Sequence, residues 1–260
     1  MKTTIFYFTG TGNSLQVAMD LSKKMDNVTI TQISESTKVD LSAERIGFVF
    51  PVYLWGVPNI VERFLKRIPI NMQGKYLFAI ATYKSQAGDT IGQVARILKH
   101  TQNRLSSGFT IEMPGNNIIY YNSEPARTQN QKIQNCRMQL IKIADIINAQ
   151  AQEIPKSSVF QAVFFTGILH AILSKIFKNS DKNFWINDKC TACGVCAKVC
   201  PVGNISIKDS NPIWNHNCQQ CVACINSCPN HAIQYGKTTI GRNRYVNQEI
   251  GVAGLLKQIK

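Results

Sequence analysis

The sequence predicts an α/β fold in which a parallel sheet carries helices on both faces, followed by a smaller α+β domain. Two observations predict this arrangement. Strand-like and helix-like segments alternate over about the first 150 residues, and such βαβα order implies a parallel sheet. Beyond them, eight of the nine cysteines fall between residues 190 and 228. The chain has 260 residues, of which 44% are hydrophobic, so it can build two small cores, and wholesale disorder is excluded.

Five short apolar runs predict buried strands because they are rich in β-branched and aromatic residues. They cover residues 3–8, 28–33, 46–50, 75–82 and 108–113. Helices are expected between and after them, at residues 15–25, 59–68, 89–100 and 124–153. In the second helix, Ile60, Phe64 and Ile68 recur at helical spacing and mark one buried face. Asp89 suits the N-cap of the third helix.

A strongly apolar segment follows the predicted sheet at residues 159–177. Its length approaches that of a membrane span, but polar residues interrupt it, and Thr166, His170 and Ser174 lie on one side of a helix. We therefore expect an amphipathic helix that packs on the protein's own surface or in a dimer contact, with no transmembrane span. Flat binding to a membrane surface is the alternative. Residues 237–260 are basic and predict a surface extension.

The cysteines form a duplicated motif, C-x2-C-x2-C-x3-C-P, whose two copies are 28 residues apart. Three thiolates at this spacing can hold three corners of an iron–sulfur cubane. Structural zinc is the alternative, but zinc takes four ligands, usually in two pairs, and would leave part of each motif superfluous. The motifs resemble those of bacterial two-cluster ferredoxins in every ligand position.

This resemblance implies two [4Fe–4S] clusters, with the fourth cysteine of each motif ligating the other cluster. Cluster one would take Cys190, Cys193, Cys196 and Cys228, and cluster two would take Cys218, Cys221, Cys224 and Cys200. The turns after the fourth cysteines differ, with Gly203 and Asn204 in one copy and His231 and Ala232 in the other. The ninth cysteine, Cys136, is expected to be a small buried hydrophobe in the long helix.

A Gly-rich loop joins the first predicted strand to the first helix and is expected to bind an anion. It comprises Thr9, Gly10, Thr11, Gly12, Asn13 and Ser14. It lacks the Gly-Lys-Ser/Thr of a nucleoside triphosphate loop, and Leu15 stands where a dinucleotide-binding fingerprint has its third glycine. An ordinary turn is the alternative. The pattern T-x-T-G-x-S resembles the phosphate loop of flavodoxins, which implies a site for the FMN phosphate.

Two further loops leave the carboxyl ends of predicted strands, where open α/β sheets bind ligands. Their aromatic side chains suit stacking on a flavin ring, and their glycines permit backbone contact with its polar edge. The candidates are Pro51, Tyr53, Leu54, Trp55 and Gly56 after the third strand, and Thr82, Tyr83, Lys84 and Gly88 after the fourth. The alternative is that Tyr53 and Trp55 are core aromatics. Weaker candidates after the fifth strand are Asn116, Asn117 and Tyr120.

Taken in this order, the chain resembles flavodoxin–ferredoxin fusion proteins of anaerobic bacteria and archaea. The resemblance implies a doubly wound, five-stranded, flavodoxin-like sheet of order 2-1-3-4-5. It also implies FMN, and electron transport between FMN and two [4Fe–4S] clusters in anaerobic metabolism. The expected division is a flavodoxin-like domain at 1–153, an apolar helical linker at 154–181, a ferredoxin domain at 182–236 and a basic extension at 237–260.

The formal net charge of +14 favours acidic redox partners, such as acidic ferredoxins or an oxidoreductase. Nucleic-acid binding is not expected, because the sequence has no recognised module and no long Lys/Arg run. The N-terminus lacks the apolar stretch and cleavage site of a secretory signal, so a cytoplasmic location is expected.

An electron carrier is favoured over an enzyme with its own substrate, because the sequence shows no nicotinamide-binding fingerprint and no further catalytic motif. Two alternatives stay open. One is an FMN-dependent oxidoreductase that reduces a small acceptor, such as a quinone, with electrons from the clusters. The other is a redox adaptor that docks on a larger complex through residues 159–177. A homodimer is also compatible with the sequence.

Overall fold

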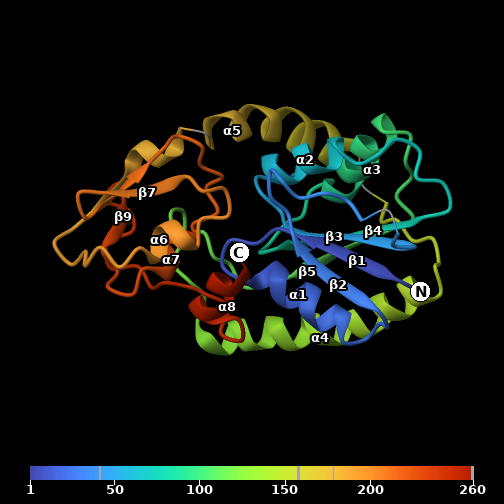
Figure 1. The fold of residues 1–260 in the computed structure, drawn as a ribbon, viewed down its shortest axis with the longest axis horizontal. Coiled ribbons are helices and arrows are strands. Elements are labelled where there is room, and N and C mark those ends of the chain that lie inside the picture. Colours follow the sequence, from blue (N-terminus) through green and yellow to red (C-terminus); the bar gives the residue numbers. More distant parts are fainter. Residues whose placement is uncertain (41, 157–158, 178, 259–260) are drawn as a thin grey trace.

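A five-stranded parallel sheet forms the centre of the first half of the chain (Figure 1). The computed structural model describes residues 1–40, 42–156, 159–177 and 179–258. The strands are β1 (Thr3–Tyr7), β2 (Val28–Gln32), β3 (Arg45–Pro51), β4 (Tyr76–Tyr83) and β5 (Ser107–Glu112). They pair in the order β2-β1-β3-β4-β5, all parallel. This confirms the five predicted strands and the flavodoxin-like order.

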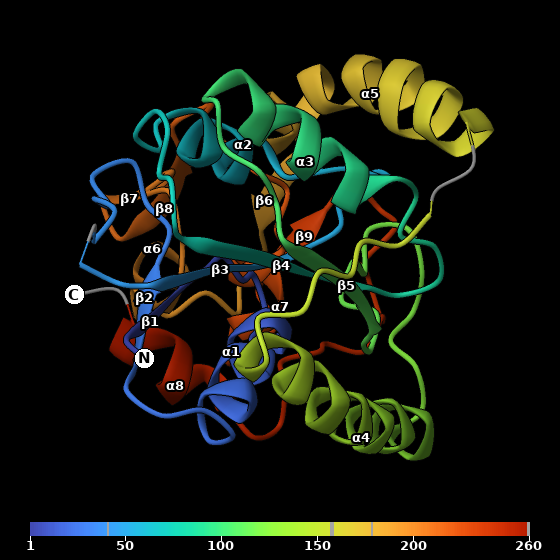
Figure 2. The ribbon, with the colours of Figure 1, turned by 90° about the vertical axis from the view of Figure 1, so that its right-hand side faces the viewer.

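Helices cover both faces of this sheet, as Figure 2 shows along its edge. On one face lie α1 (Asn13–Ser22) and α4 (Ala126–Asn148), and on the other lie α2 (Asn59–Lys66) and α3 (Thr90–His100). Each layer has its own buried cluster, because the strands are apolar on both faces. Cys136 is buried in the cluster beneath α4, as its helical position predicts.

The long helix α4 ends earlier than its apolar pattern suggests. Residues 149–153 leave the helix, and the backbone N–H of Gly108 donates to the carbonyl of Glu153 at 2.8 Å. The chain after α4 therefore pairs with the start of β5, and this pairing replaces the last helical turn.

The cysteine-rich domain sits at the carboxyl ends of the sheet strands (Figure 1). Its two antiparallel ribbons join β6 (Phe184–Ile186) to β9 (Ile233–Tyr235) and β7 (Ile205–Lys208) to β8 (Asn211–Trp214). Its short helices are η2 (Ser180–Asn183), α6 (Val195–Lys198) and α7 (Ala223–Ser227). Phe184 stacks on Trp214 at 5.5 Å between ring centroids and helps to close this small core.

The two halves share one hydrophobic cluster. Val199, Cys221 and Ala223 of the second half pack with the α2/α3 side of the sheet, and so does Leu255 of the C-terminal segment. The domain limits expected from the sequence therefore run through a continuous apolar contact. The division of the chain at these limits stays a proposal.

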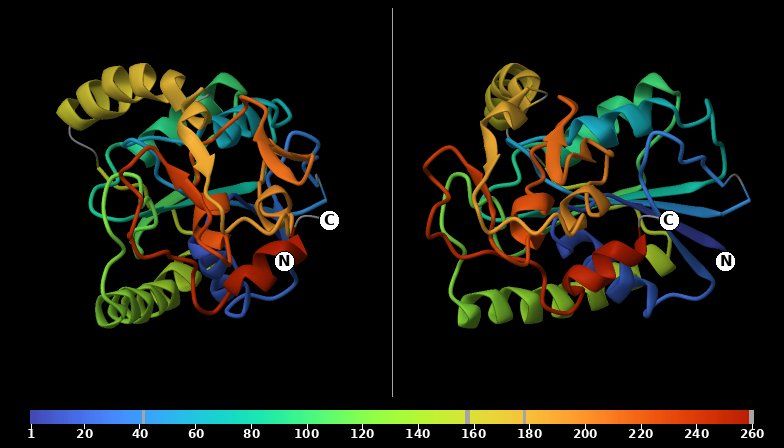
Figure 3. Two further views of the ribbon diagram at one scale, coloured as in Figure 1. Left: turned by 90° about the vertical axis from the view of Figure 1, so that its left-hand side faces the viewer. Right: turned by 60° about the vertical axis from the view of Figure 1, so that its left-hand side comes forward.

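The C-terminal segment differs from the expected surface extension. It forms α8 (Gly251–Gln258), which lies beside α1 in both views of Figure 3, and Asn247 is 0% exposed. The Asn247 N–H donates to the carbonyl of Thr11 at 2.8 Å, and the Tyr245 hydroxyl donates to Oδ1 of Asn13 at 2.6 Å. The segment carries basic residues, but it also carries polar groups that form hydrogen bonds with the Gly-rich loop. These hydrogen bonds hold the segment against the protein.

The apolar segment after residue 158 is helical, as expected. It forms η1 (Gln161–Leu169), a π-helix, and α5 (His170–Phe177), and these lie outside α2 and α3 (Figures 1 and 2). Among the described residues, no helix has the length and apolar character needed to cross a bilayer.

Candidate functional site

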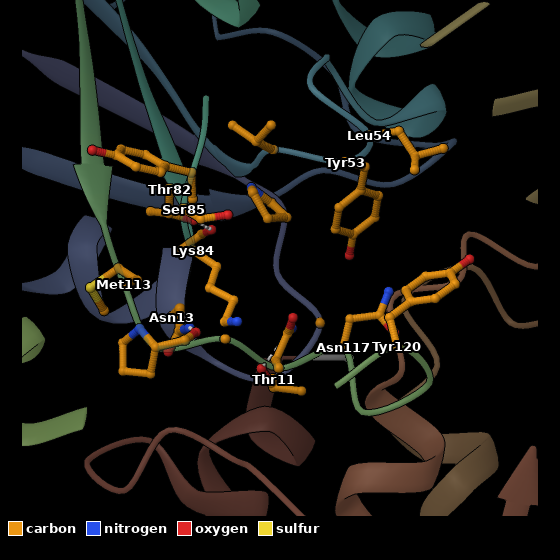
Figure 4. A pocket seen from close by; sticks show the side chains of 18 of the residues that line it. Thr11, Asn13, Tyr53, Leu54, Thr82, Lys84, Ser85, Met113, Asn117 and Tyr120 are labelled. Carbon is orange, nitrogen blue, oxygen red and sulfur yellow. Dashed lines mark hydrogen bonds between the residues drawn. The ribbon is translucent and has the colours of Figure 1, made fainter. Parts of the chain in front are cut away.

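A cavity of about 250 Å³ opens at the carboxyl edge of the sheet (Figure 4). Three loops predicted from the sequence meet there, and a fourth comes from the segment after β5. The predicted residues that line it are Thr9, Gly10, Thr11, Asn13, Ser14, Pro51, Tyr53, Leu54, Trp55, Thr82, Tyr83 and Lys84. The weaker candidates Asn116, Asn117 and Tyr120 line it too. Ligands bind at this edge in open α/β sheets because the order of strands reverses there.

The Gly-rich loop presents hydroxyl groups and backbone N–H groups at the start of α1. Thr9 Oγ1 accepts the Gly12 N–H at 3.1 Å, and the Ser14 and Thr82 hydroxyls lie 2.9 Å apart. Gly12 has φ +101°, in the left-handed region that glycine tolerates without strain. This is the arrangement of an anion site at a helix N-terminus. The Asn13 side chain contacts the C-terminal segment, because its Oδ1 accepts a hydrogen bond from the Tyr245 hydroxyl.

The loop after β3 makes a tight hairpin turn that carries the aromatic candidates. Tyr53 and Gly56 exchange two backbone hydrogen bonds, at 2.9 and 3.0 Å, and Leu54 and Trp55 between them have φ of +48° and +59°. Two consecutive non-glycine residues in this region are strained, and such strain concentrates at binding sites. The turn holds Tyr53 over the cavity, as Figure 4 shows. Its hydroxyl is buried and has no hydrogen-bond partner among the described residues.

Three predicted glycines do not line the cavity. A side chain on Gly56 would meet His170, one on Gly88 would meet Thr166, and one on Gly12 would meet Asn247. At Gly56 and Gly88 the small size permits the close approach of the linker helix, and at Gly12 it permits that of the C-terminal segment. These partners lie more than 75 residues along the chain, so no local pattern indicates them.

Sequence reasoning missed several residues that line the cavity, and two of them, Tyr121 and Gln220, make specific contacts there. Tyr121 lies beneath the Lys84 ammonium, which is 3.9 Å from the ring centroid. Gln220 comes from the cysteine-rich domain, and its side chain accepts the Tyr120 hydroxyl at 3.3 Å. Tyr121 follows a candidate directly and could have been found by extending the loop, whereas nothing in the local sequence of Gln220 indicates its position.

The eight cysteines of the second half gather in two groups. Cage one consists of Cys190, Cys193, Cys196 and Cys228, and cage two consists of Cys200, Cys218, Cys221 and Cys224. Each group borders a separate small cavity. The fourth cysteine of each motif thus lies with the first three of the other. Among the described residues, no three His, Cys, Asp or Glu side chains close around a single metal ion.

Backbone N–H groups point at the sulfurs of the fourth cysteines. Asn204 N–H donates to Cys200 Sγ and Ala232 N–H donates to Cys228 Sγ, each at 3.2 Å. The different turn residues leave this bond unchanged, because Gly203 and His231 share a left-handed φ, +59° and +52°. Hydrogen bonds of this kind stabilise the negative charge that an iron–sulfur cluster places on its thiolates, so both cages fit such a cluster.

Burial raises the pKa of several cage thiols, so these thiols are hard to ionise without a metal. It raises the pKa of the Cys196 thiol to about 11, with Cys193 and Cys228 raising it further. It also raises the pKa of Cys218 to about 11, and Cys200 contributes in the same direction. Only a cation inside the cage would replace these protons near neutral pH, so binding of metal releases them.

The comparisons with known proteins bear on this second half. The 4Fe-4S binding domain family matches residues 184–206 and again residues 215–236, which hold all eight cage cysteines. Residues 184–206 and 215–236 are thus similar to 4Fe-4S binding domains, and we call these two stretches the 4Fe-4S domains. A polyferredoxin protein, MvhB, of Methanothermus fervidus is 36% identical over 53 residues, which are 20% of this chain and 13% of that protein. An uncharacterized protein of Methanocaldococcus jannaschii is 36% identical over 53 residues, 20% of this chain and 14% of that protein. The chain thus matches a small part of each relative's length.

Solved structures similar to the first half include flavodoxins. One is from Streptococcus pneumoniae TIGR4, with 14% identity, a TM-score of 0.42, and coverage of 58% of this chain and 100% of that one. Another, from Fusobacterium nucleatum, was solved bound to flavin mononucleotide, with 15% identity, a TM-score of 0.41, and coverage of 58% and 100%. The order of the sheet strands shows the flavodoxin-like fold independently of these similarities.

The 4Fe-4S domains touch the cavity through cage two. Gly10 of the Gly-rich loop packs against the Cys221 backbone so closely that a Cβ on Gly10 would lie 2.4 Å from the Cys221 carbonyl oxygen. From the other side, Asn226 of α7 donates to the carbonyl of Asn116 at 3.0 Å. Cage two and the cavity are therefore separated by little more than one layer of backbone.

Arg244 lies beside Ile233, a residue that borders cage one. Its Nη2 donates to the carbonyl of Ile233 at 3.0 Å, while its Nε and Nη1 are buried and have no hydrogen-bond partner in the part of the chain that the structure describes. Burial lowers the pKa of this guanidinium, and the sulfurs of Cys228 in cage one and Cys224 in cage two oppose that effect. A cation with two free donors next to both cages is suited to balance the charge of anionic clusters.

Proposed function

We propose that this protein relays electrons between two [4Fe–4S] clusters and FMN, in the order cage one, cage two, flavin cavity. The two 4Fe-4S binding domains support an electron-transfer role. The observation that carries the order is the packing of Gly10, on the wall of the cavity, against Cys221 of cage two. FMN when bound exchanges one or two electrons, whereas each cluster exchanges one, so the chain would convert between the two modes.

The remaining residues of the cavity have roles that follow from their chemistry. Thr9, Thr11 and Ser14 would hold the phosphate, with the N–H groups at the start of α1. Tyr53 and Trp55 would supply flat apolar walls to the ring, and the unpartnered Tyr53 hydroxyl would gain a polar partner. Lys84, held over Tyr121, would add positive charge near an anionic group.

Electrons would enter or leave through cage one. Cys193 is exposed, and all four cysteines of cage two are buried or half-buried. The surface of this basic chain favours acidic redox proteins as partners. A partner that binds at cage one would leave the flavin cavity free. The two ends of the relay, cage one and the flavin cavity, would then lie at different places on the protein.

Anaerobic purification tests the cofactor assignment. About eight irons, eight acid-labile sulfides and one FMN are expected per chain. Rapid mixing with a reduced acidic ferredoxin should then bleach the flavin absorbance only after the EPR signal of reduced clusters has appeared. Zinc without sulfide would overturn the cluster half of the proposal, and protein that cannot be reconstituted with flavin would overturn the other half.

Replacing Arg244 with glutamine should make the clusters harder to reduce. The change removes one positive charge and two unpartnered donors beside both cages, so the reduced, more negative clusters lose stabilisation. An EPR-monitored redox titration should show lower midpoint potentials at unchanged iron content. The control is Arg242→Gln, because Arg242 donates to the carbonyl of Ile118 instead. Equal potentials in Arg244→Gln and wild type would contradict this role.

A further inference from the structure

The helical segment 159–177 directs polar side chains toward the protein and apolar side chains away from it. Among the side chains that the structure describes in this segment, those that face away from the protein are apolar, and they recur every four residues. These outward side chains are Val159, Phe160, Val163, Phe164, Ile168 and Ile172, each between 46% and 80% exposed. We call them the outer apolar face. A surface helix of a globular domain normally directs such residues to its core.

The polar side of the same helix is fastened to the protein. Thr166 donates to the carbonyl of Trp55 at 2.7 Å and accepts the Asp89 N–H at 2.9 Å. His170 is 4% exposed, and its Nδ1 lies 3.1 Å from the carbonyl oxygens of both Tyr53 and Leu54. Rotation of the helix to bury the outer apolar face would break all of these bonds. The outward orientation is therefore built in, and something other than this chain's own core must cover that face.

Charge around the helix indicates what covers it. Lys156, which is exposed, precedes the outer apolar face, and Lys175, Lys178 and Lys182 follow along the sequence. No acidic residue occurs between Glu153 and Asp181, and the whole chain carries +14. A phenylalanine-rich apolar strip flanked by lysines is complementary to an anionic lipid surface, whose headgroups attract the lysines while the strip enters the acyl boundary.

The composition of the strip favours lipid over a protein surface. Interfaces between proteins mix polar and apolar area and form hydrogen bonds across it. The outward positions 159, 160, 163, 164, 167, 168, 171 and 172 carry only Val, Phe, Gly, Ile and Ala. Such side chains offer no hydrogen bonds to a partner and need none in lipid.

We propose that the outer apolar face docks the protein flat on the surface of an anionic membrane, with η1 and α5 lying in the interface and not crossing it. The inference stands independently of the electron relay. Because Thr166 and His170 hold the turn that bears Trp55, docking would bring one rim of the cavity close to the lipid surface.

Sedimentation of the cofactor-loaded protein with lipid vesicles tests this docking. Binding is expected to vesicles of phosphatidylcholine mixed with phosphatidylglycerol, to be weaker to phosphatidylcholine alone, and to fall as salt is raised. Absence of binding to the anionic vesicles overturns the proposal without any variant. So does equal binding to both kinds of vesicle at every salt concentration, because the lysines would then contribute nothing.

A triple variant tests which residues bind. Val163→Gln, Ile168→Gln and Ile172→Gln together keep helix-forming residues but remove the apolar strip, and vesicle affinity should fall at least about tenfold. The matched control places the same three changes at the exposed Ile70, Met138 and Ile240, and should bind like wild type. Equal affinity of the triple variant and wild type would overturn the proposal. Light scattering that shows a wild-type dimer and a monomeric triple variant would also overturn it, because a second copy would then cover the face.

Discussion

Cys200→Ala and Cys196→Ala should each lose about half of the iron. Only Cys200→Ala should also stop electron exchange between the remaining cluster and the flavin. Both residues belong to the first sequence motif, yet Cys200 lines cage two and Cys196 lines cage one. Because cage two packs on the flavin cavity through Cys221, loss of its cluster breaks the relay at its inner step. In Cys196→Ala the inner cluster remains and should still exchange electrons with the flavin.

Freeze-quench EPR combined with flavin absorbance distinguishes the two variants. After a brief pulse of reductant, Cys196→Ala should share electrons between its remaining cluster and the flavin as fast as wild type, whereas Cys200→Ala should not. Uncrossed ligation would make both variants lose the same cluster and behave alike. Full iron content in either variant would instead remove that cysteine from the set of ligands.

The second large effect is expected at Gly10. In Gly10→Ala the added methyl group would meet the Cys221 carbonyl oxygen at 2.4 Å, so the Gly-rich loop and cage two must move apart. We expect about 1–3 kcal/mol lower stability toward unfolding, as for other overpacked contacts. Both clusters and the flavin should still bind, but electron exchange between them should slow.

Gly74→Ala is the matched control for this change. It adds the same methyl group at a left-handed turn, with φ +76° and open space around it, so it costs conformational strain without touching the junction. Stopped-flow kinetics of flavin reduction by the clusters, at equal cofactor content, should separate the variants. If Gly10→Ala exchanges electrons as fast as Gly74→Ala, the contact with Cys221 does not set the path.

Much of the fold followed from patterns that are local in the sequence. The apolar runs predicted all five strands of the sheet, and the duplicated cysteine motif lies within the residues that match the 4Fe-4S binding domain. Three loops predicted to bind FMN do meet at one cavity, because the carboxyl ends of parallel strands share one edge. The FMN itself, the ligand assignment, the domain limits, the partners and the location stay predictions.

Other expectations were changed by contacts between distant residues. Gly56 and Gly88 face the linker helix rather than the cavity, and Asn247 carries the C-terminal segment inward to the Gly-rich loop. The segment at 159–177 was expected to be helical with Thr166 and His170 on one side, but only its packing showed that these two side chains turn toward the protein. Amphipathicity describes a difference between the two faces of a helix, but it does not tell which face packs against the protein.

The sequence alone was enough to predict the sheet and the cysteine motifs, because a strand pattern and a cysteine motif each lie within a few consecutive residues. The tertiary structure alone decided how the parts connect. The contact of Gly10 with Cys221, the entry of Gln220 into the cavity and the outward turn of the apolar helix each join residues more than 75 positions apart. Such contacts depend on the fit of whole surfaces, which no local pattern encodes.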